Sequence, residues 1–269
     1  MSGVMELEAD HDRLRTDAKR SDEYNNTEPF PHIAFDDFIR PGVMEEVYEE
    51  LVSATDRPWH GMEDRYQRKY ACADTSQIGP KTRALIHFLN GQEMINFLEE
   101  LTGIEGLIPD PSLAGGGLHE LRDGGYLNVH ADFNFQPHIR LDRRINLLLY
   151  FNKDWKEEYG GNLELWDTEM ETCVKRFTPD FNRCVIFNTT DKSFHGNPEP
   201  VTTPDSRTRR SIALYYYTNG RPADEVSSEH ATLFQYRPGE ASSGDRRRRF
   251  LKKLLPPIVS ELLSRGKVR

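Results

Sequence analysis

Two hydrophobic patterns divide the chain. Apolar residues recur every three or four positions within residues 41–54 and again within 81–101, which predicts amphipathic helices. Pro41 suits the first turn of the first helix, and Asn90-Gly91 is expected to break the second pattern into two helices. From Gly115 onward, short runs rich in β-branched and aromatic residues alternate with Gly, Asp, Asn and Pro. That texture predicts strands.

The predicted strands follow one another at short and regular intervals. They are GGGLHEL, GYLNVHADF, RINLLLYF, GGNLELWD, NRCVIFN and RRSIALYYY. Because no helical pattern separates them, an antiparallel sandwich or barrel is indicated rather than a parallel sheet. The expected fold class is therefore mostly β with flanking α, with the N-terminal helices packed against the β core in one domain.

The two ends of the chain differ from its middle. Residues 1–28 are polar and charged, and we expect them to form a flexible leader. Residues 241–269 form a basic tail, expected to be helical and interrupted at Pro256–Pro257. This tail is either a solvated amphipathic helix or a docking patch for an anionic partner. The domain between them is expected to span 29–240, with helical support in 41–104 and the β core in 112–218.

Composition narrows the class of protein. The formal net charge of −9 argues against broad binding of nucleic acid. The charged N-terminus does not resemble a signal peptide, and no apolar run has the length of a membrane span. Three cysteines, Cys72, Cys173 and Cys184, lack C-x-x-C spacing, which fits a reducing compartment. We expect a cytoplasmic protein without nucleic-acid or membrane partners, and the sequence does not specify its oligomeric state.

A possible metal site lies in the run LNVHADFNF, residues 127–135. In a strand, His130 and Asp132 point to the same face because side chains two apart share a face. An imidazole and a carboxylate aimed at one point suit a metal ion, although they also suit an ion pair on a wet surface. A third candidate ligand, His195, follows the strand-like run RCVIFN.

Three arginines, Arg207, Arg209 and Arg210, stand at the start of the last predicted strand. If that strand is regular, one face of it carries an arginine, two small residues and a tyrosine: Arg209, Ser211, Ala213 and Tyr215. Small residues beside an arginine leave room for a ligand. Arg210 then points to the opposite face with Ile212 and Leu214.

The order of these residues resembles that of the Fe(II)/2-oxoglutarate-dependent oxygenases of the double-stranded β-helix superfamily, in particular their prolyl 4-hydroxylase-like branch. LLYFNKDWKEEYGGNLELW looks like the central hairpin of that branch, and PFPHIAFDDFI looks like the segment that leads into the domain. The resemblance covers roughly residues 29–240 and is weakest over 50–110. It implies a jelly-roll, or cupin-like, double-stranded β-helix core.

The resemblance also implies roles for individual residues. His130, Asp132 and His195 would be the catalytic centre and the ligands of Fe(II). Arg209 would hold the C5 carboxylate of 2-oxoglutarate, which is a task for a cation that stays charged when buried. Tyr150 would place its hydroxyl against the same carboxylate, and the alternative for it is a core tyrosine bonded to the backbone.

The expected function is therefore a dioxygenase that hydroxylates an unactivated C–H bond and decarboxylates 2-oxoglutarate to succinate. Fe(II), 2-oxoglutarate and O₂ are the implied cofactors and co-substrates, with ascorbate as a candidate stimulant. Asp132 favours hydroxylation, because related halogenases carry a small residue at that position. By analogy with relatives, Trp59 and residues 63–74 are expected to form a lid over the substrate.

Several alternatives stay open at this point. The expected substrate is a small molecule or amino-acid-type compound, and the runner-up is a prolyl residue in a peptide or protein. A β-helix protein that binds ligands without catalysis is the alternative of another class. A zinc hydrolase is disfavoured, because Arg209 would then have no carboxylate to hold. The sequence specifies neither the site of oxidation nor whether hydroxylation, desaturation or cyclisation follows.

Overall fold

The computed structural model describes residues 11–54, 57–205 and 207–240. Residues up to Gln235 belong to one compact unit, and Tyr236 onward belongs to a second. Five α-helices lie in the N-terminal part of the first unit: α2 (His11–Ala18), α3 (Ser21–Asn25), α4 (Pro41–Ser53), α5 (Pro80–Leu89) and α6 (Gln92–Thr102). Two short 3-10 helices, η2 (Thr75–Gln77) and η3 (Glu157–Tyr159), complete the helical elements described.

The helix boundaries follow the local sequence. α4 and α5 each begin with a proline in the first turn, where the missing N–H removes no intrahelical hydrogen bond. Asn90 and Gly91 separate α5 from α6, as predicted. α6 ends at Gly103, whose φ of 72° is the left-handed conformation that glycine adopts without strain.

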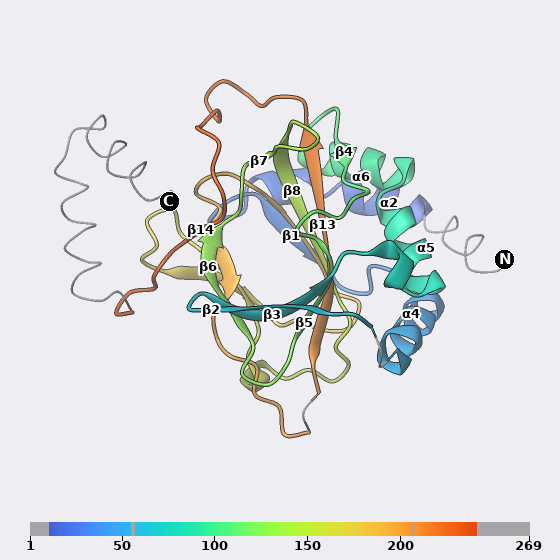
Figure 1. The fold of residues 1–269 in the computed structure, drawn as a ribbon. Coiled ribbons are helices and arrows are strands. Elements are labelled where there is room, and N and C mark those ends of the chain that lie inside the picture. Colours follow the sequence, from blue (N-terminus) through green and yellow to red (C-terminus); the bar gives the residue numbers. More distant parts are fainter. Residues whose placement is uncertain (1–10, 55–56, 206, 241–269) are drawn as a thin grey trace. The chain divides into compact units, whose positions relative to one another are not determined.

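The strands of the described chain form a single sheet. They are β1 (His32–Phe35), β2 (His60–Asp64), β3 (Gln67–Cys72), β4 (Ile108–Pro109), β5 (Gly117–Leu121), β6 (Tyr126–Ala131), β7 (Phe135–Gln136), β8 (Leu141–Tyr150), β9 (Leu163–Trp166), β10 (Cys173–Phe177), β11 (Cys184–Asn188), β12 (His195–Asn197), β13 (Arg209–Thr218) and β14 (Leu233–Phe234). Neighbouring strands run antiparallel (Figure 1).

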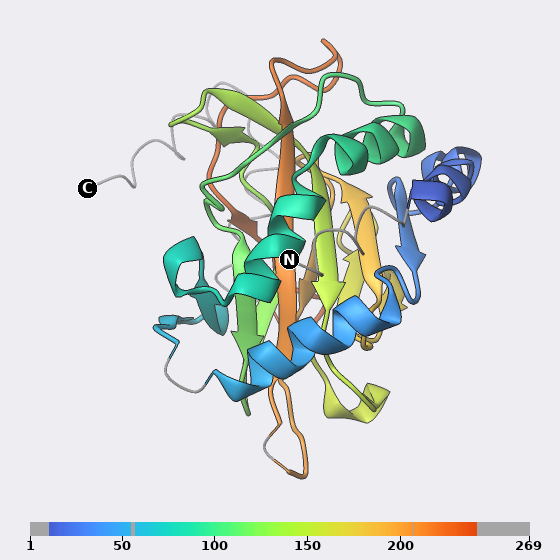
Figure 2. The same ribbon diagram turned by 90° about the vertical axis from the view of Figure 1, so that its right-hand side faces the viewer.

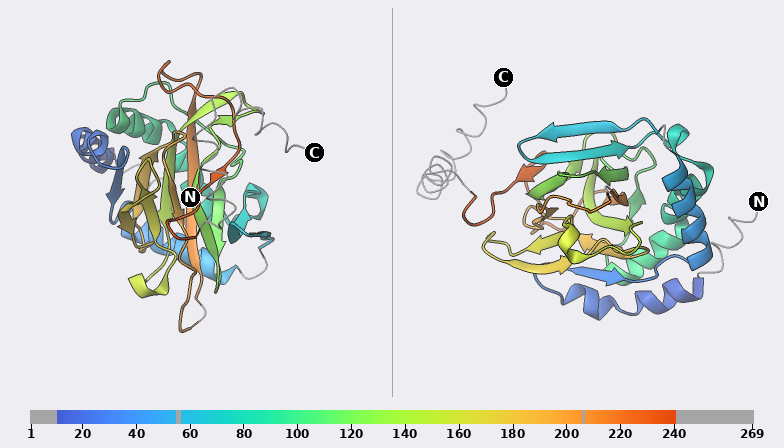
Figure 3. Two further views of the ribbon diagram at one scale, coloured as in Figure 1. Left: turned by 90° about the vertical axis from the view of Figure 1, so that its left-hand side faces the viewer. Right: turned by 90° about the horizontal axis from the view of Figure 1, so that it is seen from below.

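The sheet curls into two layers. One layer has the order β1-β11-β8-β13-β5-β3, and the other has the order β6-β12-β9-β10. β3 joins them, because residues 70–72 pair with β5 while residues 67–68 pair with β6. The view from below in Figure 3 shows the strands curling round, with the helices along one side. Antiparallel strands arranged in this way agree with the predicted β-rich core and flanking helices.

The helices cover the outer face of the first layer (Figure 2). Apolar residues of α4, α5 and α6 are buried in one cluster with alternate residues of β8 and β13, including Ile212 and Leu214. The Tyr216 hydroxyl of β13 donates a hydrogen bond to the carbonyl of Leu89 at the end of α5, at 2.8 Å. The main hydrophobic core therefore lies between the sheet and the helices. The inner face of the sheet lies outside this core.

Residues 11–28 do not form the flexible leader that we expected. Leu14 and Ala18 of α2 and Tyr24 of α3 are buried. The Tyr24 hydroxyl also donates to Oδ1 of Asn188 on β11 at 2.6 Å. The expectation failed because an apolar pair four residues apart and one tyrosine suffice to dock so short a segment. Residues 1–10 lie outside the described residues.

The predicted helical support in 41–104 is interrupted by strands. β2 and β3 form a hairpin between α4 and α5, and β3 belongs to the curled sheet. Most of the segment expected to form a lid, residues 63–74, lies in this hairpin, and its role as a lid stays a prediction. Among the described helices, none combines the length and the apolar character required to cross a bilayer. The predicted basic tail at 241–269 lies outside the described residues.

Candidate active site

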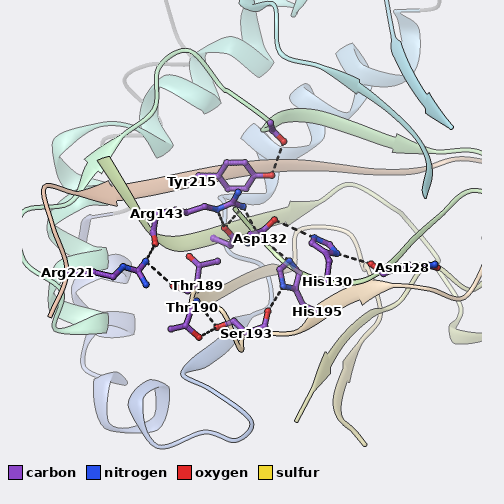
Figure 4. Close-up of polar contacts among 12 residues, drawn as sticks. Asn128, His130, Asp132, Arg143, Thr189, Thr190, Ser193, His195, Tyr215 and Arg221 are labelled. Atoms are coloured by element: carbon purple, nitrogen blue, oxygen red, sulfur yellow. Dashed lines mark hydrogen bonds and ion pairs between the residues drawn. The ribbon is translucent and has the colours of Figure 1, made fainter. Parts of the chain in front are cut away.

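Three predicted ligands meet on the inner face of the sheet. One side-chain donor atom each of His130, Asp132 and His195 lies within 4.8 Å of the others. Nε2 of His130 is 3.4 Å from Oδ1 of Asp132, and Nε2 of His195 is 3.3 Å from Oδ2. Figure 4 shows both imidazoles turned towards the carboxylate. Two imidazoles and one carboxylate form the facial set of ligands that leaves open positions on Fe(II).

Strand register brings the two histidines together. His195 is the first residue of β12 and lies opposite His130 of β6, although 65 positions separate them in the chain. The next residue is Gly196, where a Cβ atom would lie 2.9 Å from the Leu127 and Asn128 carbonyl oxygens. Only glycine allows β12 to approach β6 this closely.

The backbone fixes the orientation of both imidazoles. Nδ1–H of His130 donates to the carbonyl of Asn128 at 2.8 Å, and Nδ1–H of His195 donates to that of Ser193 at 2.9 Å. Because a carbonyl only accepts, each neutral ring carries its proton on Nδ1 and leaves Nε2 free to bind a metal. Burial, followed by the neighbouring His195, lowers the pKa of His130 and favours that neutral form.

Asp132 is held by donors on its other side. Oδ2 accepts a hydrogen bond from Nη2 of Arg143 at 2.9 Å (Figure 4). It accepts another from Nδ2 of Asn146 at 2.8 Å. Burial opposes ionisation of this carboxyl, yet the Arg143 guanidinium holds its pKa well below the usual range. Asp132 is therefore a carboxylate at neutral pH and presents Oδ1 towards His130.

Arg143 is itself locked in place. Its side chain is 1% exposed, and its guanidinium carbon lies 3.4 Å from the centre of the Tyr215 ring and 4.5 Å from that of Phe133. The Tyr215 hydroxyl donates to the carbonyl of Gly115 at 2.9 Å. The two rings lie at 86° to each other, and contact with both holds a planar guanidinium more firmly than it would hold a flexible ammonium. Arg143 is a positioning residue for Asp132.

The three ligands open into a cavity of about 590 Å³. Its lining combines residues of both layers of the sheet. On β13 it includes the face that parity predicted: Arg209, Ser211, Ala213 and Tyr215. Arg210 points away from it and pairs with Glu120 at 2.9 Å.

Arg209 is a buried cation without a counter-ion. It is 5% exposed, and its Nε–H donates to the carbonyl of Gly161 at 2.8 Å. Gly161 has a φ of 65° and follows Gly160. These are the paired glycines that precede β9 in the sequence. Within the described part of the chain, no carboxylate lies at ion-pair distance from Arg209. A buried charge is costly unless it is paired, so this guanidinium is suited to an anionic ligand.

Known proteins share this domain. Residues 116–217 match the family model described as the 2OG-Fe(II) oxygenase superfamily. This segment is a 2OG-Fe(II) oxygenase domain. It begins one residue before β5 and ends within β13, and therefore includes His130, Asp132, His195 and Arg209. The double-stranded β-helix fold that the sequence predicted is confirmed.

The similarity to curated relatives extends beyond the 2OG-Fe(II) oxygenase domain at residues 116–217. Prolyl 3-hydroxylase OGFOD1 of Mus musculus is 25% identical over 197 residues, which are 71% of this chain and 33% of the mouse protein. Prolyl 3,4-dihydroxylase OGFOD1 of Ostreococcus tauri is 24% identical over 228 residues, which are 78% of this chain and 42% of that protein. The chain thus spans between a third and a half of the length of these relatives.

Solved structures share the fold of the 2OG-Fe(II) oxygenase domain. A Trichoplax adhaerens prolyl hydroxylase, in complex with a hypoxia inducible factor peptide fragment, has a TM-score of 0.54 at 17% identity. It covers 76% of this chain and 92% of its own. A Phytophthora capsici prolyl 4-hydroxylase has a TM-score of 0.54 at 18% identity, covering 90% and 73%.

Tyr150 of β8 lies beside Arg209 of β13. The guanidinium carbon of Arg209 is 4.9 Å from the centre of the Tyr150 ring. The tyrosine hydroxyl is buried and has no well-formed hydrogen bond to a described residue. Burial raises the pKa of Tyr150, so it remains a neutral donor. The expected alternative, a core tyrosine bonded to the backbone, lacks that bond here.

Sequence reasoning missed two parts of the oxygenase site. Arg143 and Asn146 hold Asp132 from β8, 11 and 14 residues further along the chain. The predicted strand RINLLLYF begins at Arg144, so Arg143 lay one position before it, and Asn146 was a single polar residue in an otherwise apolar run. Lys69 of β3 also lines the cavity, from the segment where the resemblance was weakest.

Proposed function

We propose that the protein is an Fe(II)- and 2-oxoglutarate-dependent hydroxylase. His130, Asp132 and His195 would hold Fe(II), and Arg209 with Tyr150 would hold the C5 carboxylate of 2-oxoglutarate. One observation carries this proposal: a buried arginine that has no counter-ion among the described residues faces the same cavity as a facial metal triad. A non-catalytic ligand-binding protein has no need of the triad, and a zinc hydrolase has no need of the arginine.

Each residue of the chain has a definite task in this proposal. The two backbone-bonded imidazoles and Asp132 would present three fixed ligand atoms to Fe(II). Arg209 donates N–H groups to the co-substrate, and the Tyr150 hydroxyl supplies one more donor. Iron with 2-oxoglutarate and O₂ would supply the oxidising power, with release of succinate and CO₂. The cavity walls keep bulk water away from the reacting groups.

The substrate that we propose is a prolyl residue of a polypeptide. The curated relatives are named as prolyl hydroxylases, which supports this choice over the small molecule that the sequence favoured. A second groove of about 610 Å³ supports it as well, because Gly115, Phe133 and Thr232 line both the groove and the main cavity. A peptide could place its proline in the cavity and its flanking residues along the groove.

A spectroscopic titration tests the oxygenase assignment. Under anaerobic conditions, Fe(II) and 2-oxoglutarate should give the wild-type protein a weak visible charge-transfer band. His130→Ala should abolish the band, because the loss of a ligand exceeds the roughly 10- to 100-fold loss of affinity typical of outer-shell changes. The matched control is His87→Ala, on the exposed surface of α5, which should keep it. A wild-type protein without the band contradicts the proposal.

Turnover then tests the substrate. Proline-containing peptides and a panel of small metabolites would each be incubated with the holoenzyme. A prolyl substrate should yield succinate together with a mass gain of one oxygen, and its alanine counterpart should yield neither. Coupled oxidation of a small metabolite, but of no peptide, would restore the small-molecule alternative.

A further inference from the structure

The main cavity carries more positive than negative side chains. Among the described residues that line it, the basic ones are Lys69, Arg143 and Arg209, and the acidic one is Asp132. Arg143 and Asp132 form an ion pair at 2.9 Å. Under the proposed function, Arg209 pairs with the far carboxylate of 2-oxoglutarate. Lys69 is then the remaining cation, and no carboxylate of the described residues lies at ion-pair distance from its ammonium.

Lys69 belongs to the wall that β2 and β3 contribute. Gln67, Lys69 and Ala71 alternate along β3 and all line the cavity, as expected for side chains on one face of a strand. Lys69 is partly buried, and its ammonium makes no ion pair or hydrogen bond with the described residues. Burial lowers its pKa, and Asp132 opposes that shift in part. An unpaired ammonium inside a cavity is costly, so its presence there points to an anion that it binds.

The surroundings of Lys69 narrow the kind of ligand. Across the β3–β5 pair, His119 lies opposite Ala71 and also lines the cavity. Burial lowers the pKa of His119 to about 3, so its ring is neutral and adds no second charge. Its buried Nε2 has no hydrogen-bond partner among the described residues. One ammonium beside one neutral polar ring suits a single carboxylate better than a phosphate, which carries more charge.

We propose that Lys69 binds a carboxylate of the primary substrate, close to the carbon that is hydroxylated. This inference rests on the proposed hydroxylase activity, but not on the proposed polypeptide substrate, and it names a chemical group that the substrate carries. The carboxylate has two possible sources, the α-carboxylate of a free amino acid and an acidic side chain beside a proline in a polypeptide. Both present the same group to the same ammonium.

Pairs of probes that differ in one charge test the proposal. One pair is L-proline and L-prolinamide. The other is the capped peptide acetyl-Ala-Pro-Asp-Ala-amide and its Asn counterpart. Binding of each probe to the full chain, loaded with Mn(II) and 2-oxoglutarate, would be measured by calorimetry. We expect at least one acid to bind about 10- to 100-fold more tightly than its amide, the usual worth of a hydrogen bond to a charged group.

Variants connect that preference to Lys69. Lys69→Met should remove the difference between acid and amide, and Lys69→Arg should restore most of it. Lys175→Met is the matched control, because Lys175 lies exposed on β10 and its loss should change nothing. Equal binding of both acids and their amides to the wild type overturns the inference. A preference that survives in Lys69→Met overturns it as well.

The charge-transfer titration separates this inference from the proposed function. Lys69→Met should keep the band and its dependence on 2-oxoglutarate, because Arg209 holds the co-substrate. If Lys69→Met instead weakens 2-oxoglutarate binding tenfold or more, Lys69 serves the co-substrate and the inference is wrong while the oxygenase assignment stands. If the wild type lacks the band, the oxygenase assignment is wrong, and calorimetry still reports whether Lys69 selects acids.

Discussion

The two faces of β13 differ in chemistry although they alternate along one strand. Ile212 and Leu214 point to the helices and are at most 1% exposed, within the largest apolar cluster. Arg209, Ser211 and Tyr215 point to the cavity and are polar. Ile212 and Leu214 pack within an apolar cluster, so they gain stability from burial. The cavity side holds charges and hydrogen-bonding groups that the protein does not fully satisfy.

This difference separates stability from function within a single element. A side chain on the helix side contributes packing and can be replaced only at the expense of the fold. On the cavity side, Arg209 is a buried cation with no counter-ion among the described residues, which is an unfavourable state unless an anionic ligand pairs with it. Substitutions on the helix side should therefore lower stability, and substitutions on the cavity side should weaken ligand binding. In one case, at Arg209, ligand binding should weaken while stability stays unchanged or rises.

The largest effect on stability is expected on the helix side. Leu214→Ala should lower the free energy of unfolding by about 2–5 kcal/mol, because it leaves a cavity in a packed core. Chemical denaturation would measure this loss. The fraction that remains folded should bind 2-oxoglutarate as the wild type does. Val174→Ala on β10, where the side chain is 44% exposed, is the control and should change stability by less than about 0.5 kcal/mol.

The opposite pattern is expected for the cavity side. Arg209→Met should weaken 2-oxoglutarate binding by about 10- to 100-fold or more, since charged hydrogen bonds are worth roughly 1.5–3 kcal/mol each. The free energy of unfolding without ligand should stay unchanged or rise, because an unpaired buried charge is removed. Calorimetry and denaturation would measure the two quantities.

A neighbouring arginine supplies the control for this pattern. Arg207→Met should leave 2-oxoglutarate binding intact, because Arg207 lies outside the cavity and pairs with Asp205 at 2.5 Å. If Arg209→Met instead destabilised the protein as much as Leu214→Ala does, the arginine would be a structural residue. The contrast between the two faces would then be lost.

Alternation along a strand made much of this site predictable. The shared face of Arg209, Ser211, Ala213 and Tyr215 follows from the period of two, and so does the pairing of His130 with Asp132. The meeting of His130 with His195 was not derivable from periodicity, because it depends on which strands pair. It came from the resemblance, and the register of β6 and β12 places the two residues opposite each other.

Other features had no local signal. The helices of residues 11–25 depend on docking against α6 and β11, which a short polar sequence does not reveal. The inward direction of Arg143 depends on the acceptors Asp132 and Asn146, and these belong to tertiary structure. A charged residue at the edge of a predicted strand is usually solvated, so only the tertiary structure reveals that Arg143 points inward.

The contrast between two neighbouring arginines on β8 gives the smallest and most specific expected effect. Arg143 faces the metal site and donates to Asp132, whereas Arg144 faces the other way and pairs with Glu225 at 3.3 Å. Arg143→Met should lower the affinity for Fe(II) or Mn(II) by about tenfold, the lower end for outer-shell changes. The loss stays small because Asn146 still holds Asp132, and because removing a cation also relieves its repulsion of the metal.

The same substitution at Arg144 is the matched control. Arg144→Met should alter stability but not metal affinity, because its guanidinium makes no contact with Asp132. A purely structural role for Arg143 would move the unfolding free energy alone, so the decisive readouts are metal affinity by calorimetry and the position of the charge-transfer band. Equal metal affinity in both variants would mean that Asn146 alone orients Asp132 and that stacking on Tyr215 serves the fold.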